Sequence, residues 1–467
     1  MHARESITAF GTKLLLAVAL LLSPVCSWAQ PPISTVLSNG PTGKRINIVF
    51  LSEGYTADEL EQFRRDATNT ANSLLTVAPF DGYRGYFNAY AIAVASVESG
   101  SDHPSTGIAR NTYFKSTYES YGTAQLLTIP PNNRDSSYAN GQGKVTALLN
   151  QFMPEWDVVV LVVNDTEYGG AGGQFMTVSK HASAPEIARH ELGHSFAGLG
   201  DEYSTPYPGY PNSEEPNTTR ETNRNAVKWK AWIDPETPVP TPAGSTTAAS
   251  VGLFEGAHYN ATGWYRPKNS CKMRTLGTTY CEVCQETLVK SIYSRIGTIQ
   301  GQAPTSLLAN LVAASSRSFQ VETPAPQDRS LKVRWTFNGT QLTNTTTNLL
   351  IGAAQLAVGT NTIRVDVTDD TTMVRSDPSD YLHDSQTWKV VVAPGAQLRL
   401  LAPTLLGDGR MVFNVSGRAP SGFQIQASAN FATWTNLVSS GPLDGSITLT
   451  NPLLPGSLVG FRTIATQ

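Results

Sequence analysis

Hydrophobic and polar positions in the first three hundred residues follow two kinds of pattern. Continuous apolar runs at Arg45–Leu51 and Trp156–Asp165 predict strands that are buried on both faces. Between them, Thr56–Leu75 has helical spacing and opens with a threonine and, three residues later, a glutamate, as in a capping box. A short strand-like FMTVS then precedes a helical pattern over Ala184–Ala197. The pattern predicts an α/β or α+β domain over residues 30–298.

The helical spacing disappears near residue 299. The segments SLKVRWTFNG, NTIRVDVTDD and TWKVVVA alternate or carry branched residues between turn residues, and GRMVFNVSG, GFQIQASANFATWTNL and GSITLT do so again. We expect two all-β modules, over residues 299–395 and 396–467, each with the strand pattern of a β-sandwich. The stretch from Pro206 to Thr247 is rich in Pro, Asn, Ser and Thr, which predicts a long surface loop within the first domain.

The N-terminal segment reads as a targeting signal. Two basic residues precede a short apolar run at Leu14–Leu22, and small residues Ser27 and Ala29 precede Gln30, which predicts a signal peptide over residues 1–29. No run reaches the roughly 18 apolar residues that a transmembrane helix needs. We therefore expect an exported protein without a transmembrane segment, located outside the cell, at its surface or in the periplasm.

Composition argues against nucleic acid as a partner. With 467 residues and 40% hydrophobic content, the chain can bury several cores. The 34 Lys and Arg residues against 37 Asp and Glu give a formal net charge of −3, so no basic field is available to hold nucleic acid.

The stretch RHELGHSFAGLGDEYS contains two of the seven histidines. His190, Glu191 and His194 form H-E-x-x-H, and residues four apart lie on one helix face, so both imidazoles can reach one zinc ion. Glu191 would lie beside that ion as the general base for a water that attacks a peptide carbonyl. The pattern predicts one catalytic Zn²⁺ and the hydrolysis of a protein or peptide substrate.

A catalytic zinc ion needs a third protein ligand. In H-E-x-x-H-x-x-G-x-x-H a glycine ends the helix and the chain returns a ligand three residues later. Gly198 is one residue later than in that pattern, and the residue three beyond it is Asp201. Asp201 is the predicted third ligand. Glu202 is the alternative, because one extra helical residue turns the exit by about 100°.

Several separated motifs resemble one known family. HELGHSFAGLGDEY, INIVFLSEGYTADEL, FEGAHYNATGWYRPKNSCKMRTL and YCEVC, in their order over roughly residues 40 to 295, are similar to those of the bacterial IgA peptidases, metallopeptidase family sixty-four. The resemblance implies a metzincin-like catalytic fold that binds zinc through His190, His194 and Asp201, with Glu191 as the base. The trailing β modules resemble immunoglobulin-like repeats of exported bacterial proteins.

Other residues are candidates for supporting roles. Metzincins carry a methionine in a turn beneath the metal, and Met273 has the position for that floor. Tyr259, Tyr265 and Arg266 could direct a hydroxyl or a guanidinium at the developing oxyanion, or could instead pack and pair as structural residues. The segment GGQFMTVS could be the edge strand on which an extended peptide lies, or a loop.

Three of the four cysteines, Cys271, Cys281 and Cys284, lie within fourteen residues. Export favours a disulfide from Cys271 to Cys281 or Cys284, which leaves one thiol unpaired. With His258 the three cysteines could alternatively form a Cys₃His zinc site.

Two functions from different classes remain in competition. The first is an exported zinc-dependent endopeptidase whose β modules bring it to a surface or polysaccharide. The second is a surface or carbohydrate binding protein in which the β modules act and the peptidase-like domain is a scaffold. The intact H-E-x-x-H followed by an acid favours the peptidase.

Overall fold

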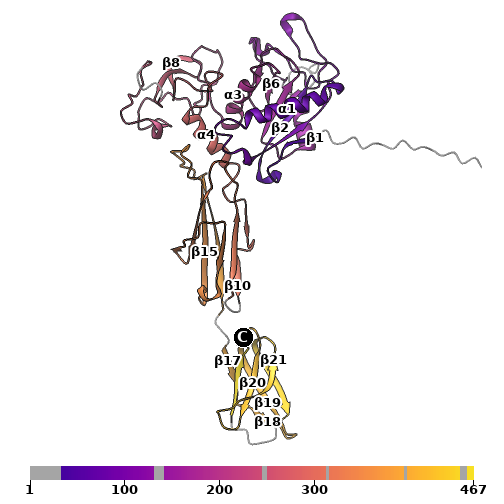
Figure 1. Ribbon diagram of the computed structural model, residues 1–467, viewed down its shortest axis with the longest axis vertical. Coiled ribbons are helices and arrows are strands. Elements are labelled where there is room, and N and C mark those ends of the chain that lie inside the picture. The colour runs from indigo at the N-terminus through magenta and orange to yellow at the C-terminus, as the bar shows by residue number, and fades with distance from the viewer. Residues whose placement is uncertain are drawn as a thin grey trace, which may run out of the picture.

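The computed structural model describes residues 33–130, 141–244, 250–311, 315–393, 397–452 and 460–466. The predicted signal peptide lies outside these residues. Along the long axis, a mixed α/β part is followed by a part made of strands and then by a second part made of strands (Figure 1). Within the described ranges, no helix has the length and apolar character needed to cross a bilayer.

The first part is built on a six-stranded sheet in the order β1-β3-β2-β4-β6-β5. Strands β3, β2, β4 and β6 run parallel to one another, whereas β1 pairs antiparallel with β3 and β5 pairs antiparallel with β6 at the two edges. The strand bounds are β1 Ile33–Leu37, β2 Ile46–Glu53, β3 Phe87–Ile92, β4 Val158–Val163, β5 Gly170–Ala171 and β6 Met176–Val178.

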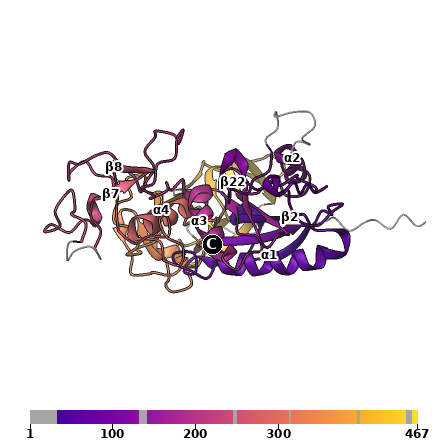
Figure 2. The ribbon, with the colours of Figure 1, turned by 90° about the horizontal axis from the view of Figure 1, so that it is seen from above.

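Both faces of this sheet are buried. On β2, Ile48 and Phe50 belong to one apolar cluster, while Val49 and Leu51 belong to another on the opposite face. The first cluster includes α1, α3 and α4, and the second includes α2, so α1 and α2 lie on opposite sides of the sheet (Figure 2). The helix bounds are α1 Leu60–Leu74, α2 Gly141–Phe152, α3 Ala184–Ala197 and α4 Glu282–Tyr293.

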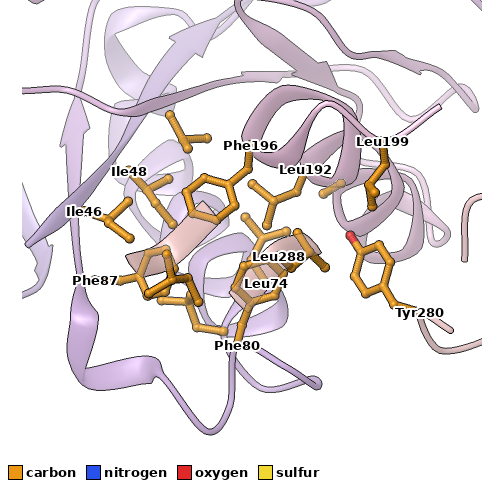
Figure 3. Packing of buried hydrophobic residues seen from close by; sticks show 14 of the residues in the cluster. Ile46, Ile48, Leu74, Phe80, Phe87, Leu192, Phe196, Leu199, Tyr280 and Leu288 are labelled. Carbon is orange, nitrogen blue, oxygen red and sulfur yellow. The ribbon is translucent and has the colours of Figure 1, made fainter. Parts of the chain in front are cut away.

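The larger cluster fixes α3 in place. Leu192 and Phe196 of α3 pack among Ile48, Leu74 and Leu288, which come from β2, α1 and α4 (Figure 3). Strand β2 and helices α1 and α4 therefore hold the apolar side of α3 in place. The expected H-E-x-x-H helix has the bounds that the sequence predicted, and the Thr56–Glu59 capping box is also present.

Beyond α3, the first part continues in irregular chain. The predicted long loop is largely without helix or strand, yet Val227, Trp229 and Ile233 anchor it in the larger cluster. A hairpin of β7 (Phe254–Ala257) and β8 (Asn260–Arg266) follows. This hairpin lies on the far side of α3 and α4 from the sheet (Figure 2).

The second part consists of two sheets around a shared apolar core. A five-stranded sheet has the order β10-β16-β15-β12-β13, and a three-stranded sheet has the order β14-β11-β9. Trp335 and Trp388 from the larger sheet stack at the centre and meet Phe319 from the smaller one. The strand bounds are β9 Gly301–Ala303, β10 Leu308–Leu311, β11 Arg317–Glu322, β12 Lys332–Phe337, β13 Thr340–Gln341, β14 Asn348–Ile351, β15 Gly359–Thr368 and β16 His383–Val392.

The third part is also made of two sheets, and both of these are antiparallel. β17, β18 and β22 pair with β19 in one sheet, and β21 and β23 flank β20 in the other. Phe413 and Phe461, one from each sheet, meet in the core. The strand bounds are β17 Gln397–Leu400, β18 Thr404–Leu405, β19 Arg410–Ala419, β20 Phe423–Ser428, β21 Thr435–Ser440, β22 Leu443–Pro452 and β23 Gly460–Ala465. A mixed α/β architecture with many strands and few helices is therefore confirmed.

A buried carboxylate joins the second part to the first. Asp369, just after β15, accepts hydrogen bonds from the hydroxyls of Tyr83 and Tyr293 at 2.7 and 2.8 Å. The Arg329 guanidinium pairs with both Asp369 oxygens at 2.8 and 2.9 Å. Tyr83 lies just before β3, and Tyr293 is the last residue of α4. The network therefore holds the second part of the chain against these two places in the α/β part.

Asp369→Ala should lower the free energy of unfolding by about 3 kcal/mol, because it leaves a half-buried guanidinium and two buried hydroxyls without their acceptor. Burial would raise the pKa of Asp369, but hydrogen bonds, of which that from Arg329 is the strongest, hold it below 3.8. The contribution is therefore complete at neutral pH and declines as the pH falls below about 4. Denaturant titrations at pH 7 and pH 3 measure both effects.

The neighbouring Asp370→Ala is the matched control. Asp370 pairs with Lys332 at 2.7 Å, but the two side chains are 50% and 62% exposed. This surface pair contributes at most about 1 kcal/mol. Equal losses in the two variants would contradict the role assigned to Asp369.

Candidate metal centre

The helix that carries H-E-x-x-H ends at Gly198. Gly198 has a φ of 62°, in the left-handed region that glycine adopts without strain, and its amide donates to the His194 carbonyl at 2.9 Å. The next amide, of Leu199, donates back to the Gly193 carbonyl at 3.1 Å. This C-terminal cap stops α3 and reverses the chain, which brings the following residues back beside the helix.

Three donor atoms converge after this reversal. The Nε2 atoms of His190 and His194 lie 3.1 Å apart. Oδ1 of Asp201 lies 3.0 Å from the first and 3.4 Å from the second. The ligands of a tetrahedral zinc ion, each bonded at about 2.0–2.1 Å, lie about 3.3–3.4 Å from one another. The triangle therefore has the size of a zinc ligand set.

The hydrogen bonds around the triangle also fit a metal site. Nδ1 of His190 faces the Lys272 carbonyl at 3.0 Å, and Nδ1 of His194 faces the Leu199 carbonyl at 2.6 Å. Each ring therefore donates its Nδ1 proton to a carbonyl, so Nε2 is the nitrogen that offers its lone pair once a cation displaces the proton shared with Asp201. Oδ1 of Asp201 is buried, and none of the residues that the structure describes donates a well-aligned hydrogen bond to it. A cation between these atoms would satisfy all three.

Asp201 is oriented by the β7–β8 turn. The Tyr259 hydroxyl donates to Oδ2 of Asp201 at 2.7 Å, which leaves Oδ1 to face the histidines. His258 and Tyr259 both have positive φ, 54° and 56°, and their amides donate to the carbonyls of Asp201 and Tyr203. Tight pairing of the two segments thus holds this turn in a costly backbone conformation.

The charges of the three groups are coupled. Burial lowers the pKa of His194, but the neighbouring Asp201 carboxylate outweighs this effect and raises the pKa to about 9. Burial likewise opposes ionisation of Asp201, yet the two histidines hold its pKa far below the usual value. The carboxylate is therefore ionised at neutral pH and available to a cation.

Glu191 directly follows His190 in α3 and lines the same cavity as the triangle. Burial is the largest influence on this carboxyl and raises its pKa above the usual value. Its Oε2 packs against the backbone of Gly172, where an added Cβ would lie only 2.6 Å away. The same Cβ would lie 3.3 Å from Cβ of His194. Glycine at position 172 thus gives the carboxylate its room.

Met273 lies beneath α3, where the metzincin floor was expected. Its side chain is fully buried, and its sulfur packs against Gly193 so closely that an added Cβ would lie 2.6 Å from Sδ. The Met273 carbonyl accepts a hydrogen bond from the Glu202 amide at 2.9 Å. Met273 therefore supports the helix between the two motif histidines and anchors the chain just after Asp201.

Two residues considered as oxyanion donors have other roles. The Tyr265 backbone pairs with Thr219 on the outer side of the hairpin. The buried Arg266 guanidinium donates to the carbonyls of Glu255 and Gly256, and to Oδ1 of Asn269 at 2.9 Å. Neither residue lines the cavity at the histidines. Tyr265 and Arg266 are therefore structural: they lie at the end of β8 remote from the turn that carries Tyr259, and their contacts hold the hairpin in place.

Glu202, the alternative third ligand, is turned away from the histidines. Its side chain is fully buried, and Oε1 accepts from Asn217 Nδ2 at 2.9 Å. Cys271, Cys281 and Cys284 lie beside it as free thiols, so the expected disulfide is not formed.

His258 does not join the cysteines. Its ring is held between Glu215, 2.9 Å from Nδ1, and the Pro211 carbonyl, 2.7 Å from Nε2. The Cys₃His alternative is therefore wrong in its fourth member.

The strand expected at the sheet edge also needs correction. FMTVS forms β6, which lies inside the sheet between β4 and β5. The edge is the two-residue β5 at Gly170–Ala171, whose chain continues into Gly172 and lines the cavity.

The site opens into a cavity of about 440 Å³. Its walls combine the sheet edge on one side with tyrosines from the chain after the motif on the other. The sequence analysis missed Tyr203 and Tyr210, although YSTPYPGYP directly after the motif was the available signal. The cavity is lined by Thr123, Gln125, Leu126, Tyr168, Gly170, Ala171, Gly172, Gly173, Ile187, His190, Glu191, His194, Asp201, Tyr203, Tyr210, Tyr259 and Leu276.

Comparison with known proteins gives one family. The family described as IgA Peptidase M64 matches residues 35–247 and 243–292. These residues include every element of the metal centre. No curated protein matches the chain.

Solved structures give only distant similarity. Three N-terminal domains of the outer capsid protein Hoc from bacteriophage RB49 are 13% identical, with a TM-score of 0.20, over 34% of this chain and 58% of theirs. A Bacteroides ovatus SGBP-B in complex with a mixed-linkage heptasaccharide is 14% identical, with a TM-score of 0.15, over 33% and 60%. The chain thus spans less than two thirds of each. TM-scores this low support no conclusion about this chain.

Gly172→Ala should reduce kcat/KM for peptide hydrolysis by about 100-fold, because the added methyl displaces the Glu191 carboxylate by roughly 1 Å. Bound metal should change little, since the methyl meets Glu191 at 2.6 Å but His194 only at 3.3 Å, where a shift of a few tenths of an ångström relieves the contact. Gly43→Ala is the matched control, because a Cβ there meets nothing within 4 Å. Full activity in Gly172→Ala would contradict the role of this contact.

Tyr259→Phe should weaken metal binding by about 10–100-fold, the usual loss when a hydrogen bond to a ligand is removed. Competition with a chromophoric chelator measures the affinity. Tyr207→Phe is the control, because Tyr207 is exposed and packs against Tyr259. Unchanged affinity in Tyr259→Phe would show that Asp201 needs no external orientation.

Proposed function

The chain belongs to the IgA peptidase M64 family, and from this membership we propose that it is an exported zinc-dependent endopeptidase. A peptidase of this family acts on a protein substrate. The observation that carries the proposal is the convergence of His190, His194 and Asp201 at 3.0–3.4 Å with Glu191 beside them in an open cavity.

The ligand set favours zinc. Two imidazole nitrogens and one carboxylate oxygen suit zinc, and three protein ligands leave a fourth position for water or substrate. A zinc ion held by these residues would polarise the scissile carbonyl and lower the pKa of an attacking water to about 7.

The residues of the chain perform the proton transfers. Glu191 accepts the proton of the attacking water and returns it to the amine that leaves. The raised pKa of Glu191, caused by burial, brings this carboxyl closer to the working pH of a proton shuttle. Tyr259 holds Asp201, and the two backbone carbonyls opposite Nδ1 hold the histidine rings.

The sheet edge offers a place for the substrate. β5 is antiparallel to β6 and is the last strand on this side of the sheet. An extended peptide that adds to β5 would run past Gly172 toward Glu191. Such backbone pairing recognises a peptide through its main chain, with side-chain preference left to the tyrosines of the cavity.

A metzincin-like fold is part of the proposal. The support is the glycine that ends α3, the ligand three residues beyond it and the buried methionine under the helix. We further propose that residues 1–29 direct export, that residues 30–298 form the catalytic domain, and that the immunoglobulin-like modules at 299–395 and 396–467 bring it to a surface or polysaccharide.

Glu191→Gln should retain zinc and lose at least about 1,000-fold in casein hydrolysis, because general base catalysis and its alignment contribute 10²–10⁴-fold. Zinc content is measured by plasma mass spectrometry, with Glu61→Gln on the surface of α1 as the control. Casein hydrolysis that persists in Glu191→Gln would refute Glu191 as the base. A wild-type protein that binds no zinc at His190 and His194 would favour the binding-protein alternative.

A further inference from the structure

A second group of ligand-type side chains lies behind the catalytic triangle. Glu202 directly follows Asp201, Cys271 lies two residues before Met273, and Cys281 and Cys284 lie at the start of α4. One donor atom from each of the four residues lies within 4.8 Å of the other three. All four side chains are buried.

The distances agree with tetrahedral zinc. Sγ of Cys271 lies 3.6 Å from Sγ of Cys284, and Sγ of Cys284 lies 3.8 Å from Oε1 of Glu202. With Zn–S bonds of about 2.3 Å and a Zn–O bond of about 2.0 Å, the expected separations are about 3.8 Å between two sulfurs and 3.5 Å between sulfur and oxygen. A small shift of side chains would complete the tetrahedron.

The carboxylate gives an independent sign of a missing partner. Oε2 of Glu202 is buried and has no hydrogen-bond partner in the part of the chain that the structure describes. A buried carboxylate oxygen in this state is costly unless a cation or proton satisfies it. A disulfide between any two of the three cysteines would leave this oxygen without a partner and the third thiol unpaired.

The surroundings suit the charge of such a site. Three thiolates and one carboxylate around Zn²⁺ carry a net charge of −2, so nearby cations are needed. Arg274 Nη1 donates to the Glu202 carbonyl at 3.1 Å, and the charge of buried Arg266 acts on Glu202. The Cys281 amide also points at Sγ of Cys271 at 3.4 Å. This last contact stabilises a thiolate.

We propose that Glu202, Cys271, Cys281 and Cys284 bind a second, structural zinc ion. Binding releases the three thiol protons and fills all four positions with protein ligands, which leaves none for substrate. The ion would join the chain after Asp201, the Met273 turn and the first turn of α4. It would thereby hold the third ligand and the methionine floor of the catalytic centre, while its binding does not depend on peptidase activity.

Zinc analysis of three proteins, purified without reductant, tests the proposal. The wild type should hold two zinc ions per chain, and His190→Ala/His194→Ala should hold one. X-ray absorption at the zinc edge of this double variant should show three sulfur ligands at about 2.3 Å. Cys281→Ser/Cys284→Ser should lose the sulfur-bound ion, and if it does not fold, the spectrum of the histidine variant still decides.

Thiol titration of the denatured histidine variant, produced without residues 1–29 and so without Cys26, separates the alternatives. Three reactive thiols in the presence of chelator, together with one zinc ion before denaturation, support the site. One reactive thiol indicates a disulfide and overturns the proposal, as do three thiols without bound zinc. Failure of the catalytic site alone gives a different result, since the wild type would then hold one sulfur-bound ion that the histidine substitutions leave in place.

Discussion

The left-handed turn at Gly198 is the constraint on which the metal centre depends. A continued helix would carry Asp201 onward along the axis, away from the two histidines. The turn instead reverses the chain within three residues, and the Leu199 carbonyl that it exposes accepts the Nδ1 proton of His194. One backbone conformation thus supplies the third donor and orients the second. Helix α3 itself is held by the apolar core, so the turn begins from a fixed point.

The segment Cys271–Met273 supports the centre from below. The Lys272 carbonyl orients His190, the Met273 side chain packs under Gly193, and the Met273 carbonyl accepts the Glu202 amide. Cys271 belongs to the proposed zinc-binding group. The catalytic triangle and the cysteines are therefore not independent features. Lys272 and Met273 support the triangle, and the adjacent Cys271 belongs to the cysteine group. A change that loosens this segment would be expected to disturb metal binding and packing together.

The sequence was sufficient where the determining contacts are local. The bounds of α3 follow from helical spacing and a terminal glycine, and Asp201 was reached by counting from Gly198. The sequence was insufficient where partners come from distant segments. Tyr259 acquires its role only because the β7–β8 turn pairs with the chain after Asp201, whereas Tyr265 and Arg266 lie at the other end of β8 and do not line the cavity. Similarly, the fourth partner of the cysteines is Glu202 rather than His258, because the long loop holds His258 against Glu215.

The central claim is that His190, His194 and Asp201 together hold one zinc ion. Anomalous diffraction at the zinc absorption edge, from crystals of the zinc-loaded protein, tests it most directly. The account predicts a peak at about 2.0–2.2 Å from both Nε2 atoms and from Oδ1 of Asp201. A peak bonded to the histidines but completed by a residue other than Asp201, or no peak between the histidines, would contradict it.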